Sequence, residues 1–341
     1  LSITSDNIAD MKIRSSIRVA TAVMVPALTL TLGACVTNEE LGNPDGWVEI
    51  LPETQPELAA LVPSDIRERG TLSAAANTPY APNEFKDSDG NIIGFEMDLV
   101  KAAGSVLGLN VVPRQMDFNL ILPALSAGTV DVGASAFTDT EERQEKYDFV
   151  DFFSAGVAWA TQPGRHTDID LANACGLTVA VQKGTYSDTD EVEEKSQACE
   201  AAGKPAIHKL VYPTADAAAT ATILKRTDAY SSDSSVIAYA VERADGDLTQ
   251  IGKAFDTAPF GFAFPKGSPL APAFAEAMQH MIQDGSYDRI LKPWGLQEGG
   301  LNEVTFNLKP YTPARATTPQ KAARTRHRPS KTNNQQQKEA S

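Results

Sequence analysis

Cysteine and histidine are scarce in this 341-residue chain, which contains three of the first and four of the second. They form no cluster with the spacing of zinc ligands, so we expect neither a metal site nor a bound cofactor. Beyond residue 34 the chain also lacks an apolar run long enough to cross a bilayer. These absences argue against a metalloenzyme and against a protein with several membrane spans.

The central part of the chain has far fewer basic residues than acidic ones. The formal net charge is -14, and the termini lower its magnitude, because residues 1–34 carry +1 and residues 309–341 carry +7. Residues 35–308 therefore hold a net charge of -22. A body this acidic repels phosphate backbones, so we expect no nucleic-acid partner.

The N-terminus has the pattern of an export signal. A basic leader with Lys12, Arg14 and Arg18 precedes an apolar stretch over residues 19–32, and residues 1–10 lie upstream of that pattern. The following Leu32-Gly33-Ala34-Cys35 resembles the lipobox of bacterial lipoproteins. The resemblance implies that residues 1–34 are removed and that Cys35 is lipidated, which anchors the chain to the outer face of the cytoplasmic membrane. An ordinary signal peptide with a chance cysteine is the alternative.

Both flanks of the body are polar. Residues 35–65 are acidic and rich in proline, and we expect a flexible tether; residues 301–341 are expected to form a basic, disordered tail. In an exported chain the remaining cysteines, Cys175 and Cys199, are predicted to form a disulfide. Two buried free thiols are the alternative.

The body alternates helical and strand-like segments, which predicts an α/β fold. Strands are expected over residues 72–76 and 130–135 and a helix over residues 95–107. Two further strand-like segments, 155–162 and 256–264, are placed to join two lobes. The predicted division is lobe 1 over residues 66–156 and 257–300 and lobe 2 over residues 157–256. Ligands of such proteins bind in the cleft between lobes.

The segment Gly94-Phe95-Glu96-Met97-Asp98-Leu99, followed by Ala103-Gly104 and Leu107, resembles the signature of solute-binding protein family 3. The likeness runs from about residue 72 to residue 295. It implies the two-lobed type II periplasmic-binding-protein fold, with two mixed-sheet lobes joined by two hinge strands. It also implies a monomeric receptor that captures a free amino acid and delivers it to an ABC transporter permease. Glu96 and Asp98 are interpreted as first-turn helix acids, which the helix dipole favours, and not as ligand contacts.

The family resemblance also implies which residues hold the ligand carboxylate. Arg143 matches an arginine that forms a bidentate pair with it, a task suited to the planar guanidinium. Thr138 matches a hydroxyl contact, and Ser135 and Ala136 match a small-residue strand end facing the cleft. Thr185, in a loop that opens a helix, matches a threonine that reaches the same carboxylate. The alternatives are a surface arginine and threonines that only cap helices.

Four more residues complete the implied site. Asp233 matches the aspartate that pairs with the ligand ammonium, and Tyr80 and Phe118 match aromatic rings that sandwich its side chain. A helix-capping aspartate and ordinary core aromatics are the alternatives. Asn77 stands where receptors for cationic amino acids often carry aspartate. We therefore expect a polar uncharged or acidic ligand in preference to a cationic one.

An enzyme of the same fold is the rival interpretation. Cyclohexadienyl or arogenate dehydratases resemble this family, and they need an additional acid close to the leaving group of the substrate. Glu84 is the single candidate for that acid, and its sequence neighbours give no sign of activation. A binding protein without catalytic activity is therefore the favoured interpretation.

Overall fold

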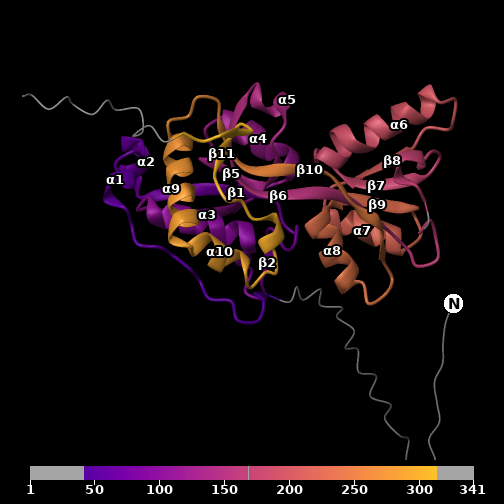
Figure 1. Cartoon of the computed structure of the whole chain (residues 1–341), viewed down its shortest axis with the longest axis horizontal. Coiled ribbons are helices and arrows are strands. Elements are labelled where there is room, and N and C mark those ends of the chain that lie inside the picture. Colours follow the sequence, from indigo (N-terminus) through magenta and orange to yellow (C-terminus); the bar gives the residue numbers. More distant parts are fainter. Residues whose placement is uncertain (1–41, 168, 313–341) are drawn as a thin grey trace, which may run out of the picture. The chain divides into compact units, whose positions relative to one another are not determined.

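The computed structural model describes residues 42–167 and 169–312, in which one long mixed sheet organises the chain (Figure 1). Its main path runs β4-β1-β5-β10-β6-β9-β7-β8. In that order the strands are Asn110–Gln115, Thr71–Ala76, Val132–Thr138, Thr249–Pro265, Tyr147–Thr161, Ala229–Asp233, Thr178–Gln182 and His208–Tyr212. Strands at each end of the path pair in parallel, whereas the central pairs are antiparallel.

Two long strands connect the halves of this sheet. The N-terminal part of β6 pairs with the C-terminal part of β10, which in turn pairs with β5. The C-terminal part of β6 pairs with the N-terminal part of β10 on one side and with β9 on the other. Register shifts interrupt the β6–β10 ladder between Ile251 and Phe255 and between Phe255 and Ala258. Of the two segments predicted to join the lobes, 256–264 lies within β10, and 155–162 lies within β6 except for its last residue. Together the two strands produce the mixed two-lobed α/β architecture. The residue borders of each lobe stay a prediction.

Helices pack on the sheet because their apolar faces are buried. In the first half, α3 (Phe95–Val106) packs on β4 and β5, α4 (Phe118–Ser126) packs on β5, and α9 (Leu270–Asp284) packs on β6. In the second half, α7 (Ala215–Ile223) covers β7 to β9, and α8 (Ser234–Arg243) contacts β6, β9 and β10. No helix among the described residues is both long and apolar enough to cross a bilayer.

The shorter elements lie at the ends and in connections. They are α1 (Pro56–Ala59), α2 (Ser64–Arg69), β2 (Phe85–Lys86), β3 (Ile92–Ile93), α5 (Glu141–Gln144), η1 (Leu171–Asn173), η2 (Ser187–Glu191), α6 (Val192–Ala201), α10 (Ser286–Leu291), η3 (Gln297–Gly299), β11 (Thr305–Phe306) and β12 (Lys309–Pro310).

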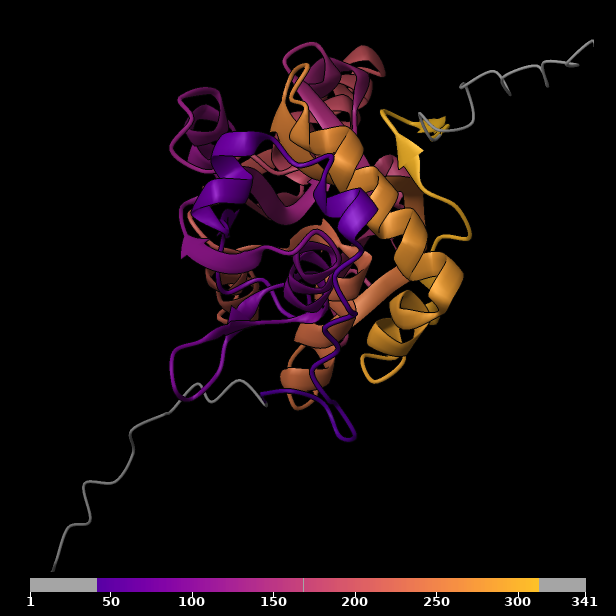
Figure 2. The same ribbon diagram turned by 90° about the vertical axis from the view of Figure 1, so that its left-hand side faces the viewer.

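The predicted tether over residues 35–65 is wrong for the part that packs on the body. The Trp47 indole donates to Asp98 at 2.7 Å, and the Gln55 amide donates to the Val106 carbonyl at 2.9 Å. Leu58 and Val62 are buried in the main core, and Figure 2 shows the α1 region beside α9. A few apolar anchors and backbone hydrogen bonds therefore hold a segment whose overall composition is polar. Residues 1–41, with Cys35 and the predicted signal, lie outside the described residues.

The predicted tail also begins later than residue 301. Val304 is buried, and Phe306 of β11 pairs with Val150 of β6. The Asn307 side chain accepts from the Phe149 amide and donates to Asp148. The first residues of the predicted tail thus form an extra sheet edge, and residues 313–341 lie outside the described residues.

Cys175 and Cys199 form the predicted disulfide, which links the segment after η1 to α6 across a sequence separation of 24. In the chain-entropy account, opening a loop of this size costs about 3 kcal/mol of stability. We expect the double substitution Cys175→Ser/Cys199→Ser to lower the free energy of unfolding by about that amount, measured by urea denaturation. Because the bond lies away from the cavity described below, ligand affinity should stay unchanged. A stability equal to that of the parent protein would contradict a structural role.

Candidate functional site

A small cavity collects most of the predicted ligand-binding residues. It has about 210 Å³ of empty space, including open solvent, and is lined by Tyr80, Phe118, Ala136, Thr138, Arg143, Thr185, Tyr186 and Asp233. The first five belong to the half of the chain with β1, β4 and β5, and the last three follow β7 or end β9. Seven of the nine predicted residues therefore meet around one cavity, although they lie as far apart as residues 80 and 233.

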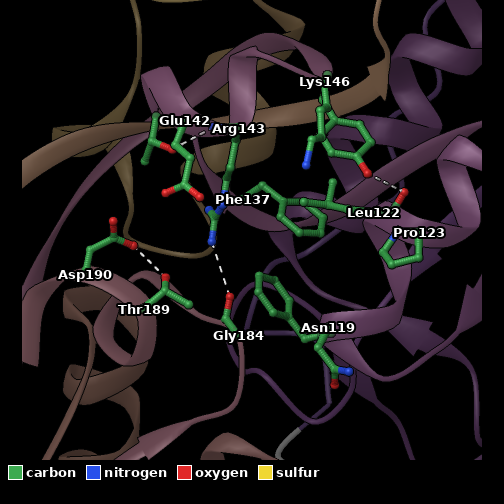
Figure 3. A pocket seen from close by; sticks show the side chains of 13 residues that line it. Asn119, Leu122, Pro123, Phe137, Glu142, Arg143, Lys146, Gly184, Thr189 and Asp190 are labelled. Carbon is green, nitrogen blue, oxygen red and sulfur yellow. Dashed lines mark hydrogen bonds between the residues drawn. The ribbon is translucent and has the colours of Figure 1, made fainter. Parts of the chain in front are cut away.

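Arg143 extends from the short helix α5 toward both halves of the protein. Its Nη1 donates to the Thr138 carbonyl at 2.8 Å. Its Nη2 donates to the Gly184 carbonyl at 3.3 Å (Figure 3). Thr140, not Thr138, caps α5 by accepting from the Arg143 amide. The guanidinium is thus oriented by two carbonyls, and no carboxylate of residues 42–167 and 169–312 forms an ion pair with it. It is available to bind an anionic group.

Asp233 provides the acid of the cavity. The Tyr80 hydroxyl donates a hydrogen bond to its carboxylate and lies 3.3 Å from the Ser232 hydroxyl. Burial raises the pKa of Asp233 to about 6, while the Tyr80 hydrogen bond and the charge of Arg143 act to lower it. The Asp233 side chain does not cap α8, so the capping alternative does not describe it. A carboxylate with this partial compensation is suited to bind an ammonium group.

The aromatic wall of the cavity is rigid. Phe118 begins α4 and stacks on Phe137 of β5 with ring centroids 4.7 Å apart. The Arg143 guanidinium lies 5.9 Å from the Phe137 ring centre. Tyr80 and Phe118 both line the cavity and are mostly buried. An apolar part of a ligand can therefore contact two rings while its charged ends face Arg143 and Asp233.

The two hydroxyl residues occupy different environments. Thr138 ends β5 and lines the cavity. The Thr185 hydroxyl donates to the Gln182 carbonyl at 2.8 Å, which fixes its orientation in the loop before η2. Thr185 is therefore bound within its own loop rather than capping a helix. Its oxygen can still accept or share a hydrogen bond at the cavity.

Asn77 and Ser135 lie behind the cavity wall. Asn77 donates from its side chain to the Met116 carbonyl at 3.0 Å and accepts from the Gln182 side chain at 2.7 Å. The Asn77 backbone amide donates to the Ser135 hydroxyl at 3.0 Å. Gln182 is the last residue of β7, so its hydrogen bond with Asn77 joins the two halves of the sheet. These two residues are the predicted site residues that do not line the cavity.

Beneath Ser135 lie two fully buried acids, Glu84 and Glu96. The Ser135 hydroxyl donates to Glu84 at 2.5 Å, and the Ala136 amide donates to Glu96 at 2.8 Å. Burial raises the pKa of Glu96 to about 8 and raises the pKa of Glu84 well above its ordinary value. Glu96 and Asp98 do lie in the first turn of α3, as expected, but specific hydrogen bonds hold both.

Sequence reasoning missed Tyr186, Gln182 and the role of Glu84. Gln182 lies three residues before the predicted Thr185, and Tyr186 directly follows it. Their closeness in sequence to a predicted site residue was the signal that could have identified them. Gln182 leaves its side-chain carbonyl oxygen buried without a hydrogen-bond partner among the described residues. That oxygen can accept an N–H group from a ligand or from a rearranged neighbour.

A second, larger cavity lies on the outer side of Arg143 (Figure 3). It has about 860 Å³ of empty space, including open solvent, and its walls include Phe118, Phe137, Glu142 and Asp190. The charges of Asp190, Asp233 and Glu142 act to raise the pKa of Arg143, which its burial lowers. Arg143 thus lies between an open outer cavity and the small inner one.

Buried acids make the stability of the protein depend on pH. Burial raises the pKa of Glu96 and of Asp151 to about 8 and that of Glu191 to about 7. The folded state therefore holds more protons than the unfolded state between about pH 5 and pH 8, and its stability falls as the pH rises through that window. We expect a lower melting temperature of the ligand-free protein at pH 8 than at pH 5.5. Glu191→Gln should flatten this slope, and a melting temperature that rises with pH would contradict the account.

The fold and cavity define a class: a two-lobed α/β receptor of the type II periplasmic-binding-protein fold. The family model of bacterial extracellular solute-binding proteins, family 3, matches residues 72–297. The chain belongs to this family.

Individual relatives agree with that assignment. The arginine-binding protein ArgT of Corynebacterium glutamicum is 54% identical over 292 residues, covering 86% of this chain and 96% of the relative. An ancestral arginine-binding protein, solved with arginine and also with glutamine, is 32% identical and covers 66% of this chain and 98% of its own. The TM-scores of these two structures are 0.61 and 0.60.

Proposed function

We propose that this protein is a lipid-anchored extracytoplasmic receptor that captures a free amino acid, L-arginine, and delivers it to an ABC import permease. The observation that carries the proposal is that Arg143 and Asp233 line the same small cavity. A free amino acid presents a carboxylate and an ammonium at a fixed separation. Arg143 binds the carboxylate, and Asp233 binds the ammonium.

The geometry also supports a binding mode that links the two lobes. Arg143 extends from α5 and Asp233 ends β9, and the two strands β6 and β10 connect the corresponding halves. A zwitterion held by both residues stabilises the conformation in which the halves are in contact. Because the ligand binds this conformation more tightly, it shifts the population toward it, and a permease can distinguish loaded from empty receptor.

The relatives support arginine as the ligand. The 54% identical protein is named for arginine, and so is the ancestral protein at 32% identity. This counts against the expectation of an uncharged or acidic ligand, which was based on Asn77. The Asn77 side chain binds Met116 and Gln182 in the structure and need not set the ligand charge alone.

Anchoring and delivery remain proposals that the sequence supports. Cys35 follows a lipobox-like motif, and a lipid keeps an exported receptor close to its permease. Residues from Trp47 onward pack on the body, so the link to Cys35 is shorter than the 35–65 segment first suggested. A single lipid chain would give only weak membrane binding, so diacylation of Cys35 is expected.

The rival enzyme has no support in the cavity. Glu84, the acid that a dehydratase would need, is fully buried and accepts the Ser135 hydroxyl. It does not line the cavity. We therefore propose that the bound amino acid is released unchanged.

Calorimetric titration of the full mature chain tests the ligand assignment. Arginine, lysine, glutamine, glutamate, cystine and histidine would each be titrated at pH 7.5, with arginine expected to bind most tightly. Stronger binding of glutamate or cystine would overturn the proposed ligand. Turnover of arogenate or prephenate by the same preparation would overturn the assignment as a binding protein.

A further inference from the structure

A buried pair of carboxyl groups lies directly behind the cavity wall. Glu84 ends the loop before β2 and Glu96 lies in the first turn of α3, and neither side chain is exposed. Oε2 of Glu84 and Oε1 of Glu96 are buried without a hydrogen-bond partner among the described residues. Their hydrogen-bond donors are the adjacent residues Ser135 and Ala136, so the two carboxyl groups lie close together, and the charge of Glu96 acts to raise the pKa of Glu84.

The backbone conformation brings the two carboxyl groups together. Gly94, at a φ of 130°, precedes α3, and a Cβ atom there would lie 2.1 Å from the Asn83 carbonyl oxygen. The Phe95 and Glu96 amides donate to the Pro82 and Asn83 carbonyls. The start of α3 is thus held against the 82–84 loop, which brings Glu96 to Glu84. A side chain at residue 94 would separate them.

Two hydrogen bonds and one electrostatic interaction connect this pair to the residues around the ligand cavity. Glu84 accepts from Ser135, and Glu96 accepts from the amide of Ala136, which lines the cavity. Asp233, on the opposite side of the cavity, interacts electrostatically with both carboxyl groups. The positive charge of Arg143 in turn acts to lower the pKa of Asp233. The charge of the pair therefore changes the electrostatic potential in the cavity.

A charge balance indicates what the pair can do. Arg143 and Asp233 neutralise each other, and a zwitterionic ligand backbone adds no net charge. A cationic side chain adds one positive charge, which a buried pair that carries both of its protons can balance by giving up one of them. An uncharged side chain requires no such release. The pair can therefore remain protonated with one type of ligand and become a single negative charge with the other.

We propose that the Glu84–Glu96 pair is a specificity determinant that favours amino acids with a cationic side chain by releasing a proton when they bind. The inference rests on the proposed function and adds a reason why Asn77 does not exclude arginine. The two glutamates act as positioning residues for charge, through Ser135 and Ala136, and need not touch the ligand.

Titration calorimetry in buffers of different ionisation enthalpy tests the inference. Arginine and its uncharged isostere citrulline would be titrated into the full mature chain at pH 6.5, 7.5 and 8.5. Arginine is expected to release up to about one proton more than citrulline, so that its relative affinity rises by up to about tenfold per pH unit. The contribution of Asp233 is common to both ligands and cancels in this ratio.

Substitutions separate charge from structure. In Glu84→Gln the new amide donates to Glu96 and holds it ionised, so the preference for arginine should persist while its pH dependence disappears. In the double variant Glu84→Gln/Glu96→Gln the preference should fall by about tenfold or more, the effect of one unit charge in a partly screened site. Asp151→Asn is the matched control, because Asp151 is a buried acid that interacts with Asp139 and Thr305 instead of the cavity. Its proton release should equal that of the parent.

The outcomes distinguish the two levels of the account. A parent protein that does not bind arginine would overturn both the proposed function and this inference. Arginine binding with the same proton release and pH slope as citrulline would overturn the inference alone. That comparison uses the parent protein, so it is decisive even if the double variant does not fold.

Discussion

Arg143→Ala is expected to weaken amino-acid binding by at least about 100-fold, because a desolvated ligand carboxylate would lose its charged partner. Arg143 is oriented by the Thr138 and Gly184 carbonyls, so its guanidinium is pre-positioned rather than ordered by the ligand. Pre-positioning lowers the entropic cost of binding and makes the loss on truncation larger. Calorimetric titration with arginine would measure the change.

Two further variants make this result specific. Arg143→Lys keeps the positive charge but cannot form a planar bidentate pair, so it should recover only part of the affinity. Arg69→Ala removes an arginine that pairs with Asp131 at 2.8 Å, outside the cavity, and should leave binding unchanged. Equal affinities for Arg143→Ala and the parent protein would refute the site as a whole.

Asp233→Asn is expected to produce the second large loss, of about 30-fold or more, because the ligand ammonium would lose its ionised partner. The substitution should also change the pH dependence. Since the pKa of Asp233 is raised by burial to about 6, lowering the pH through 6 protonates it in the parent protein and weakens binding. In Asp233→Asn this acid limb should be absent.

Tyr80→Phe is the matched control for that experiment. It keeps the aromatic ring at the cavity and removes only the hydroxyl that donates to Asp233. We expect a small effect on affinity, because the ligand ammonium can replace that donor. A loss as large as that of Asp233→Asn would mean that the Tyr80 hydroxyl, and not the carboxylate, dominates recognition.

Much of the cavity could be predicted because short motifs carry its residues. Thr138 ends β5 and Arg143 lies five residues further on, and Asp233 is the last residue of β9. Such positions at strand ends bring residues together whenever the strands join one sheet. Resemblance to the family supplied the roles, and the strand order supplied the proximity.

The Glu84–Glu96 pair could not be predicted in the same way. Both acids looked like ordinary polar residues, one in a loop and one in a first helical turn. Their contact depends on the positive φ of Gly94 and on backbone hydrogen bonds to Pro82 and Asn83. The local sequence does not show whether an acidic residue is buried. Burial of Glu84 and Glu96 depends on the packing of two segments that are separate in the sequence.

The N-terminal segment shows a limit of composition as a guide. Residues 35–65 are acidic and rich in proline, yet Trp47, Leu58 and Val62 each pack on the body. A few anchors at suitable spacing outweigh the average, because burial of each large apolar side chain contributes about 1.5–3 kcal/mol. The start of the predicted tail is held similarly, by Val304 and by the pairing of Phe306 with Val150.

A crystal structure of the mature chain grown with L-arginine tests the central claim most directly. We expect the ligand carboxylate within hydrogen-bonding distance of the Arg143 guanidinium and its ammonium beside Asp233, with the side chain between Tyr80 and Phe118. The guanidinium end should lie toward the side of the cavity backed by Ser135 and Ala136. Arginine bound elsewhere, or in the reverse orientation with its ammonium at Arg143, would contradict the account.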